Sequence, residues 1–337
     1  MNDAESTDTQ NSNRHAPRGL IKKIGLVYTI ATFPNQADSM FSCYDPVWRF
    51  SKSRRALRTT SRCHLRGLWL GLALALLTHA ADAGTQRAIE LRVLTYNTHG
   101  LPAWIAWDRP EYRFPLIGRR LNAYDVALVQ EDFYHHEHLL AAVQHPIISR
   151  GNAGSGLTTL LKADGVRLVD SEQVRYRDCA GWLLNRSDCL ANKGFLRTRL
   201  ELPGGMQVDV VNTHLDSGED MVDHKARRAQ LDTLISHVKR ATPAGALVLG
   251  GDFNLDRNEP RDRALLERLI AELGLTDSEA LDGSTAGWSH VDYLFYRSGP
   301  GTYLEVLEAG EAAEFTVEGV PLSDHPALNL RLRIIAR

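Results

Sequence analysis

The chain has 337 residues, of which 43% are hydrophobic and 24% are charged, and its formal net charge is −2 at pH 7. This length and hydrophobic content allow one large core or two small ones, and the lack of an internal repeat excludes a solenoid or an array. We interpret the sequence as one folded domain, 84–337, behind an N-terminal leader.

The N-terminal 83 residues have the features of a leader. Residues 67–83 combine a short apolar core with small residues before a cut after Ala83, and arginines precede them, which predicts a secretory signal. The apolar core is short for a membrane span, which needs about 20 residues. An uncleaved anchor or a buried helix is the alternative. Residues 1–66 are longer than the segment that ordinarily precedes the apolar core of a signal. We therefore expect either a disordered extension or a true translation start downstream of Met1.

Removal of this leader changes the charge balance. Residues 1–83 hold 11 of the 39 basic and 6 of the 41 acidic residues, which leaves 28 basic and 35 acidic residues and a net charge of −7. Proteins that bind nucleic acid through its backbone usually carry a basic excess or stripe. The balance disfavours a nucleic-acid partner, although the basic run Lys225–Arg228 is a local exception.

Strand-like and helix-like segments alternate from residue 91 onward. Runs of β-branched residues or alternating apolar residues predict strands. These strands are Leu91–Asn97, Val126–Gln130, Leu157–Lys162, Gly194–Leu202, Met206–Thr213, Ala246–Gly251, Val291–Tyr296 and Leu328–Ile335. The predicted helices are Tyr112–Ala123, His138–Val143, Met221–Arg240 and Arg261–Leu273. Strands mixed with helices in this order indicate an α/β sandwich.

Five polar motifs stand where hydrophobic runs end. They are Thr95-Tyr96-Asn97, Gln130-Glu131, Asn212-Thr213-His214, Gly251-Asp252-Phe253-Asn254 and Ser323-Asp324-His325. Strand ends that converge on one cleft would gather two histidines, several carboxylates and two amides. Such a set suits metal-assisted attack on a phosphate ester.

Glu131 and Asn97 are candidates for holding a cation. Glu131 follows the apolar run Val126–Val129, so its carboxylate is expected at the mouth of a buried strand. A hard ion such as Mg²⁺ prefers oxygen ligands and often takes one or two carboxylates. The amide of Asn97 can coordinate a cation or donate to a phosphate, although a turn role also suits it. A surface glutamate is the alternative for Glu131.

His214 and the segment Gly250–Asn254 are candidates for the chemical steps. His214 can donate to a phosphate oxygen or protonate a leaving group, and a structural histidine is the alternative. The two glycines allow close backbone approach, while Asp252 and Asn254 can point the same way. A simple Asp-containing turn is the other interpretation of this segment.

Cysteines and a denser histidine group complete the candidates. Cys179 and Cys189 are the only cysteines after the leader, and an oxidising compartment favours a disulfide between them. Two reduced thiols are the alternative. His135, His136 and His138 lie on a polar turn, which is more typical of a solvated patch than of a metal site.

The five motifs, in this order, resemble those of the endonuclease/exonuclease/phosphatase superfamily, the fold of DNase I, and are most similar to those of the neutral sphingomyelinases. The resemblance covers roughly Ala88 to the C-terminus. It implies a four-layer sandwich of two packed mixed β-sheets flanked by helices. It also implies Mg²⁺, or else Mn²⁺ or another divalent ion, as the cofactor.

The resemblance assigns roles to single residues. The implied metal ligands are Glu131, Asn97 and Asp324. The implied phosphate-binding residues are Asn97, Asn212 and Lys193. The implied catalytic residues are His214, Asp252, Asn254, Asp292 and His325. Among these, Asp292 is expected to pair with His325, which acts as the base for water.

Two stretches, Gly100–Leu121 and Asp188–Phe195, narrow the resemblance to a sphingomyelinase-like phosphodiesterase. Trp104 and Trp107 favour a membrane interface, with buried packing as the alternative. The hydrophobic hairpin that bacterial toxins of this group insert into lipid has no clear match near Gly283–Ser289.

The substrate therefore stays open between several phosphodiesters, with a membrane phospholipid favoured and nucleic acid less so. A DNase I-like endonuclease is the alternative activity, and an inactive secreted binding protein of the same fold is the second alternative. We expect an exported monomer, either periplasmic or secreted.

Overall fold

The computed structural model describes residues 88–106, 109–162, 164–181, 188–279 and 291–337. All of them belong to one of the two units of the chain, Leu68–Arg337. The predicted signal segment 67–83, the extension 1–66, Trp107 and the segment Gly283–Ser289 lie outside the described residues.

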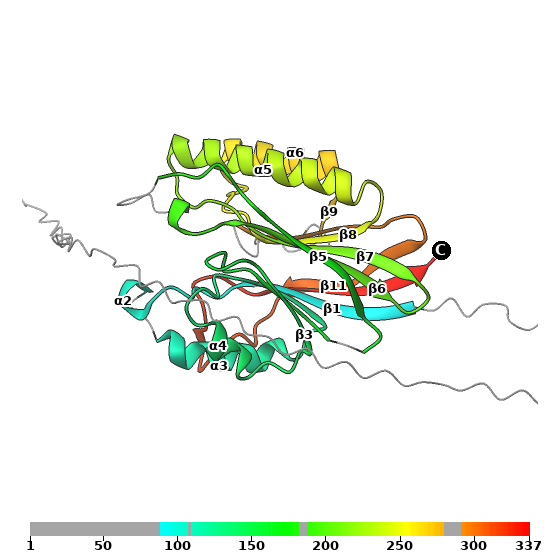
Figure 1. Cartoon of the computed structure of the whole chain (residues 1–337), viewed down its shortest axis with the longest axis horizontal. Helices are drawn as coiled ribbons and strands as arrows, with labels where there is room; N and C mark the ends of the chain where they lie inside the picture. The colour runs from blue at the N-terminus through cyan, green and yellow to red at the C-terminus, as the bar shows by residue number, and fades with distance from the viewer. Residues whose placement is uncertain (1–87, 107–108, 163, 182–187, 280–290) are drawn as a thin grey trace, which may run out of the picture. The chain divides into compact units, whose positions relative to one another are not determined.

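Two six-stranded sheets form the centre of the domain (Figure 1). The first sheet, in spatial order, contains β11 (Thr302–Glu311), β14 (Leu328–Ala336), β1 (Ala88–Asn97), β2 (Val126–Gln130), β4 (Thr158–Leu161) and β3 (Ile147–Arg150). The second contains β5 (Arg167–Arg175), β6 (Gly194–Leu202), β7 (Met206–His214), β8 (Ala246–Asp252), β10 (Asp292–Arg297) and β9 (Thr276–Asp277). A small hairpin is formed by β12 (Thr316–Val317) and β13 (Val320–Pro321).

Both sheets are mixed. In the first sheet β1 and β2 run parallel, and in the second β7 and β8 do. The other neighbouring strands pair antiparallel. Parallel neighbours have their carboxyl ends at the same edge of a sheet. The polar residues at the carboxyl ends of β1, β2, β7 and β8 can therefore meet at one edge of the two sheets.

Helices cover the outer faces of the sheets (Figure 1). The described helices are α2 (Ala103–Ala106), α3 (Pro110–Leu121), α4 (His136–Leu140), α5 (Met221–Ala241) and α6 (Pro260–Leu273), with the 3₁₀ turn η1 (Asp188–Leu190). Residues of α3 and α4 pack on the first sheet, and those of α5 and α6 pack on the second. The predicted four-layer sandwich of two packed mixed sheets flanked by helices is confirmed.

Local signals explain where the long helices begin and end. Pro110 and Pro260 occupy first-turn positions of α3 and α6, where a missing N–H costs little. Asp220 and Asp223 form a capping box at the start of α5. Gly274 ends α6 in the left-handed conformation that glycine adopts without a steric penalty.

Side-chain alternation divides the buried residues into three layers. On β1, Leu91 and Val93 join the core between the sheets, whereas Leu94 and Tyr96 face the core under α3. A third core lies between the second sheet and helices α5 and α6. The inner core is almost entirely aliphatic, and the polar residues Asn97, His214 and Asp252 are the last residues of three of its strands.

The sequence prediction differs from the structure mainly at exposed edges. The helix predicted at His138–Val143 is instead α4, His136–Leu140, followed by a turn. Strands β3, β5, β9 and β11 were not predicted, nor was the hairpin of β12 and β13. Strand β5 is almost wholly exposed or half-buried, so it lacks the apolar pattern that reveals an inner strand. Within the described ranges, no helix is long and apolar enough to cross a membrane.

Candidate active site

Polar side chains end the inward faces of the central strands. On β8, Val248 faces the inter-sheet core, so Gly250 and Asp252 face the same gap two and four positions later. The same alternation brings Asn97 on β1 and His214 on β7 to that gap. The candidate site is thus the polar end of the inner core.

The sheets approach each other closely beneath this polar end. A Cβ atom added to Gly250 would lie 2.7 Å from Leu294 Cδ2 and 2.9 Å from Leu128 Cδ1. A side chain at this position would have to displace these two leucine side chains, one from each sheet. Gly250 therefore allows Asp252, on the second sheet, to reach groups carried by the first.

Glu131, Asn97, Asp252 and His214 form a contiguous cluster. The Asn97 side-chain amide donates to Asp252 Oδ2 at 2.9 Å and to Glu131 Oε1 at 3.3 Å. His214 Nε2 lies 3.4 Å from Asp252 Oδ2 and 3.8 Å from Glu131 Oε1. The Asn97 nitrogen faces both carboxylates, so this side chain orients Glu131 and Asp252. Its role in metal or phosphate binding stays a prediction.

Two residues of the site have left-handed backbone conformations. Glu131 has φ 57° and Asn254 has φ 48°. Such a conformation costs a non-glycine residue about 1–3 kcal/mol, with asparagine tolerating it best. At Glu131 the strain directs the side chain back towards the cluster as the chain leaves β2.

Burial sets the protonation of His214 and Asp252. Desolvation, followed by the charges of Lys193 and His325, holds the pKa of His214 well below its ordinary value. Desolvation and the neighbouring Asp292 carboxylate raise the pKa of Asp252 to about 7. His214 is therefore a neutral imidazole, and its Nε2, which faces two carboxyl groups, carries the proton.

His325 and Asp292 form the predicted pair. His325 Nδ1 lies 2.7 Å from Asp292 Oδ2, and its Nε2 lies 3.9 Å from Asp252 Oδ2. Burial alone lowers the pKa of His325. The hydrogen bond and charge of Asp292, with the charge of Asp252, outweigh burial and raise this pKa to about 10.

Asn254 and Lys193 converge on one backbone carbonyl beside the cluster. The Asn254 side-chain amide donates to the Leu215 carbonyl at 3.0 Å, and its backbone N–H donates to Asp252 Oδ1 at 2.9 Å. Lys193 Nζ donates to the same carbonyl at 2.8 Å and lies 2.6 Å from Asp188 Oδ1. Asp188 was assigned no role from the sequence, although it lies in the stretch that resembles the sphingomyelinases.

Asn212 has a different environment from the one expected of a phosphate-binding residue. Its side chain is fully buried, accepts from Gln130 Nε2 at 2.7 Å, and donates to the carbonyls of Val129 and Thr158. These bonds connect the two sheets. We therefore assign Asn212 a positioning role beneath His214.

Asp324 lies outside the cluster that the other predicted ligands form. Its side chain is 57% exposed, and its Oδ1 lies 3.4 Å from His99 Nδ1. The adjacent Ser323 hydroxyl donates to the Asn97 carbonyl at 2.7 Å, which anchors the turn that carries His325. Asp324 is therefore placed to influence the site through charge.

Arg113 is a buried residue to which the sequence interpretation gave no role. Its guanidinium donates to the carbonyls of Thr98, His99 and Leu322. These carbonyls belong to the loops after β1 and before His325. One arginine thus holds two site loops together, a role that only their proximity in the fold reveals.

The histidine turn after Glu131 is a solvated patch only in part, since His138 is exposed and His135 is half-buried. His136 is buried, and its Nδ1 lies 2.5 Å from Asp132 Oδ2, which also accepts from Thr158 Oγ1 at 2.7 Å. His135 packs on Phe114 with ring centroids 5.3 Å apart. Burial against this helix face was hidden in the polar sequence of the turn.

A divalent cation fits the cluster. Among the described residues, ligand atoms lie within 4.8 Å of one another in two groups, Glu131 with His214 and Asp252, and Asp252 with Asp292 and His325. Glu131 Oε2 is buried and has no hydrogen-bond partner. Buried acceptors without a partner are costly, and a cation satisfies them. Glu131 and Asp252 are the carboxylates best placed to hold one.

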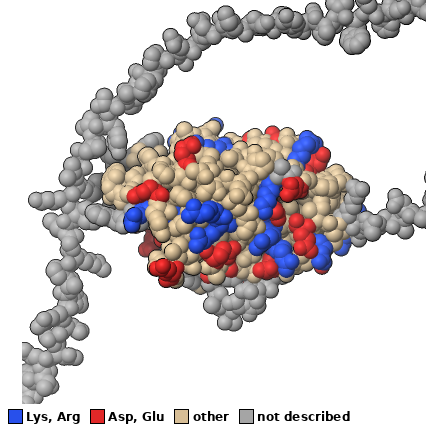
Figure 2. Space-filling view, turned by 90° about the horizontal axis from the view of Figure 1, so that it is seen from below, with Lys and Arg blue, Asp and Glu red and all other residues tan. Residues whose placement is uncertain are grey.

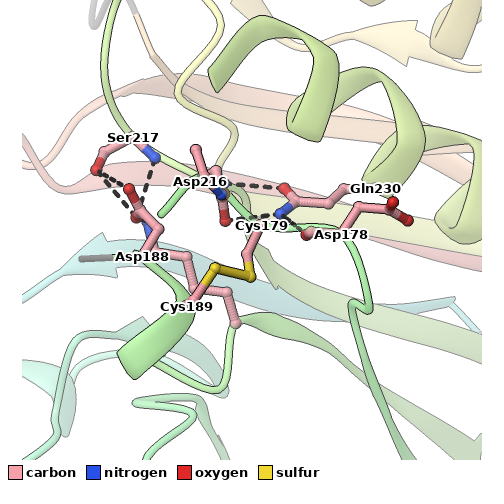
Figure 3. The surroundings of a disulfide bond; sticks show 9 residues. Asp178, Cys179, Asp188, Cys189, Asp216, Ser217 and Gln230 are labelled. Atoms are coloured by element: carbon pink, nitrogen blue, oxygen red, sulfur yellow. Dashed lines mark hydrogen bonds and ion pairs between the residues drawn. A yellow bond between two sulfur atoms is a disulfide. The ribbon is translucent and has the colours of Figure 1, made fainter. Parts of the chain in front are cut away.

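Cys179 and Cys189 form the predicted disulfide, with Cα atoms 5.2 Å apart (Figure 3). It joins the segment after β5 to η1, which carries Asp188. Asp188 accepts hydrogen bonds from the backbone and hydroxyl of Ser217, and buried Asp216 accepts from Gln230 (Figure 3). The crosslink therefore holds the segment that leads into Lys193.

The domain is a two-sheet sandwich with carboxylates and paired histidines at one edge, which is the arrangement expected of a phosphoesterase of the DNase I-like fold. The family model of the endonuclease/exonuclease/phosphatase family matches residues 94–325. The chain belongs to this family, and the resemblance inferred from the five motifs is confirmed.

Sequence relatives include a sphingomyelinase of Mycobacterium tuberculosis (strain ATCC 25618 / H37Rv), 31% identical over 256 residues, 70% of this chain and 51% of that protein. An inositol phosphosphingolipids phospholipase C of Schizosaccharomyces pombe is 29% identical over 187 residues, 50% of this chain and 42% of that protein. The chain thus spans about half the length of these relatives or less.

Solved structures share the fold. Sphingomyelinase C from Streptomyces griseocarneus matches with a TM-score of 0.51 and 22% identity, covering 74% of this chain and 100% of that one. An endonuclease/exonuclease/phosphatase from Bacteroides vulgatus matches with a TM-score of 0.56 and 16% identity, covering 72% and 98%. At these identities the likeness concerns the fold alone.

Proposed function

We propose that the protein is an exported, Mg²⁺-dependent phosphodiesterase that hydrolyses sphingomyelin or a similar phospholipid. The observation that carries the proposal is the His325–Asp292 pair, which lies across Asp252 from Glu131. The similarity to sphingomyelinases supports the lipid substrate. Water attacks phosphorus, the bond to the alcohol oxygen breaks, and a phosphomonoester and an alcohol result.

His325 is the proposed base. Its Nδ1 is engaged by Asp292, so Nε2 is the nitrogen that can accept a proton from water. Asp292 fixes this tautomer and stabilises the imidazolium that forms, as the carboxylate does in other His–Asp pairs. The proton then passes to the alcohol that leaves.

The carboxylates around His325 set a condition for this role. They raise its pKa to about 10, so the imidazolium predominates at neutral pH unless positive charge offsets them. Glu131 and Asp252 would hold a divalent cation, which would supply that positive charge and polarise the phosphoryl group when bound. Mg²⁺ is preferred because it favours carboxylate oxygens, with Mn²⁺ as the alternative.

Neutral donors and one ammonium are available for the phosphate oxygens. His214 stays neutral at the pH of the assay, so it can donate through Nε2 but is a poor proton source for the leaving group. Lys193 uses two of its three donors on Asp188 and Leu215, which leaves one for phosphate. Asn254 lies beside them and completes the proposed phosphate site.

Export to the periplasm or beyond belongs to the same proposal. The predicted signal at 67–83 motivates it, and the Cys179–Cys189 disulfide supports it because such bonds persist in oxidising compartments. The functional unit is then 84–337, acting as a monomer.

A DNase I-like activity is disfavoured by surface charge. On the face shown in Figure 2, Lys and Arg alternate with Asp and Glu, and the described residues there form no continuous basic stripe. The net charge of −7 after residue 83 points the same way. An inactive binding protein is disfavoured because two groups of possible ligand atoms, one with Glu131 and His214 and one with Asp292 and His325, share Asp252.

The test measures phosphocholine release from sphingomyelin and nicking of plasmid DNA in parallel, with Mg²⁺ or EDTA. Lipid turnover that EDTA and His325→Ala abolish, and that His138→Ala on the exposed side of α4 retains, is the expected result. DNA nicking alone would assign the protein to the nucleases. Absence of both activities in folded protein would remove the proposal.

A further inference from the structure

Exposed apolar side chains are concentrated at the catalytic edge. Of the ten large apolar residues exposed within the described ranges, seven lie on segments that enter or leave the strands of the site. These seven are Trp104, Ile105, Tyr112, Tyr134, Leu190, Met221 and Val222. Scattered exposed apolar residues are ordinary, whereas a concentration around a site indicates a binding surface.

The first group follows the first sheet and is here called the aromatic patch. Trp104 and Ile105 on α2 are 68% and 44% exposed, Tyr112 in the first turn of α3 is 52% exposed, and Tyr134 is 73% exposed. Figure 1 shows α2 projecting at the end of the sheets. The patch begins seven residues after Asn97, and Tyr134 comes three residues after Glu131.

The two segments that form the aromatic patch are held against each other. A Cβ atom at Gly100 would lie 1.9 Å from the Glu131 carbonyl oxygen and 2.8 Å from the Phe114 ring. The neighbour of Tyr134, His135, packs on the same ring. The exposed aromatic side chains therefore stand on a packed base rather than on separate loops.

The second group borders the second sheet and is here called the aliphatic patch. Leu190 on η1 is 64% exposed, and Met221 and Val222 at the start of α5 are 50% and 44% exposed. Val222 and Cys189 line one hollow of about 510 Å³, so η1 lies beside α5. The patch flanks Lys193 on one side and His214 on the other in the sequence.

Cations accompany both patches. Arg109 lies over the Tyr112 ring at 5.4 Å in the aromatic patch. Arg177 and Lys225, with one carboxylate, Asp178, line the hollow beside Val222 in the aliphatic patch. Apolar side chains next to amphipathic rings and cations match the layered chemistry of a phospholipid surface, with acyl chains below and phosphates above.

We propose that the aromatic and aliphatic patches dock the catalytic edge on a phospholipid bilayer, one patch on each side of the site. This inference rests on the proposed function, because the bilayer is the phase that holds the lipid substrate. Contact on both sides places the polar cluster over the headgroups. A bilayer fits better than a protein partner because the two patches are separated by the charged site, which a dry protein interface would have to bury unpaired.

The test compares paired variants of the full chain. Trp104→Ser with Tyr134→Ser removes the aromatic patch, and Leu190→Ser with Met221→Ser removes the aliphatic patch. Ile148→Ser with Val169→Ser is the matched control, since these residues are 40% and 39% exposed on β3 and β5, away from the strand ends of the site. Trp104→Phe with Tyr134→Phe keeps the apolar rings.

Binding is measured by sedimentation with vesicles of phosphatidylcholine and sphingomyelin in EDTA, and turnover is measured on these vesicles and on a soluble aryl phosphorylcholine ester. Each patch variant should bind vesicles about tenfold more weakly, with a matching loss of vesicle turnover and unchanged turnover of the soluble ester. The control pair and the phenylalanine pair should bind like wild type.

Unchanged vesicle binding by both serine pairs would overturn the docking inference, and so would equal losses in the control pair. Wild type that binds vesicles but turns over neither substrate would leave docking supported and remove the proposed function. If the wild type hydrolyses the soluble ester but does not bind vesicles, the proposed function would be supported and the docking inference would be removed.

Discussion

Two buried aspartates at opposite ends of neighbouring strands have opposite environments. Asp209 on β7 is 2% exposed and accepts hydrogen bonds from Arg197, Arg199 and Thr242. Asp252 on β8 is 1% exposed and meets an asparagine, two histidines and Asp292. One carboxylate is neutralised within the fold, and the other is not.

The contrast separates a structural charge from a functional one. Arginines that hold a buried carboxylate repay the cost of burying it, and the hydrogen bond to Asp209 raises the pKa of Arg199. A buried carboxylate without such partners has a raised pKa, as at Asp252, and remains available to an incoming cation. A buried carboxylate indicates a functional site when no arginine or lysine of the fold is paired with it.

The largest expected effect is on turnover. Asp252→Asn should lower kcat by about 10²–10⁴-fold, because it removes a carboxylate that faces both histidines. Asp209→Asn should leave the kcat of the folded fraction unchanged. Steady-state kinetics with active-site titration at low temperature checks both. A comparable loss of kcat in the two variants would contradict the assignment of Asp209 as a structural residue and Asp252 as a functional one.

Stability should depend more on Asp209 than on Asp252, the opposite of what we expect for turnover. Asp209→Asn leaves Arg197 and Arg199 without their shared anion, so we expect a loss of about 3–5 kcal/mol in the free energy of unfolding. Asp252→Asn should cause a smaller loss in EDTA, since Asp252 has no arginine partner and its removal relieves the repulsion from Asp292. Urea unfolding of both variants measures this, with Asp209→Glu as the charge-retaining control.

The pH dependence of stability should sharpen the contrast. The pKa of Asp252 rises from 3.8 to about 7 on folding, so the folded state binds more protons and loses stability as pH rises from about 4 to 7. The upper limit of this loss is about 4 kcal/mol. The raised pKa of His325 adds stability that is constant below pH 6.5 and disappears as pH rises through 10.

Urea unfolding in EDTA across this range, for wild type and Asp252→Asn, measures the difference. The variant should lose less stability between pH 4 and 7. Identical pH profiles would show that Asp252 titrates normally and is compensated in the fold after all.

Cation binding should give the smallest of the four effects. Mg²⁺ at 100 times its dissociation constant should stabilise the folded state by about 2.7 kcal/mol. Glu131→Gln should abolish this increase, and Asp209→Asn should retain it from a lower starting stability. Thermal melting with Mg²⁺ and with EDTA tests the point, and an increase retained in Glu131→Gln would exclude Glu131 as a ligand.

The sequence predicted the inner strands and the members of the site that end them. Asp252, His214 and Asn97 could be found because each completes an apolar run whose period of two also sets its direction. The edge strand β5 escaped prediction because none of its residues is buried, so it needs no apolar pattern. Arg113 escaped because its three acceptors are backbone carbonyls from distant loops, which no local pattern encodes.

The sequence by itself determined the order of the polar motifs and the resemblance to the family, and it favoured the pairing of Cys179 with Cys189, because these depend on residue identity and spacing along the chain. The tertiary structure decided which polar residues work together. It placed Asn212 in a link between the sheets, left Asp324 exposed, and joined Lys193 to Asp188. The physical reason is that burial and the charge of neighbours, which set each pKa and each free donor, arise only when separate strands are brought to the same edge.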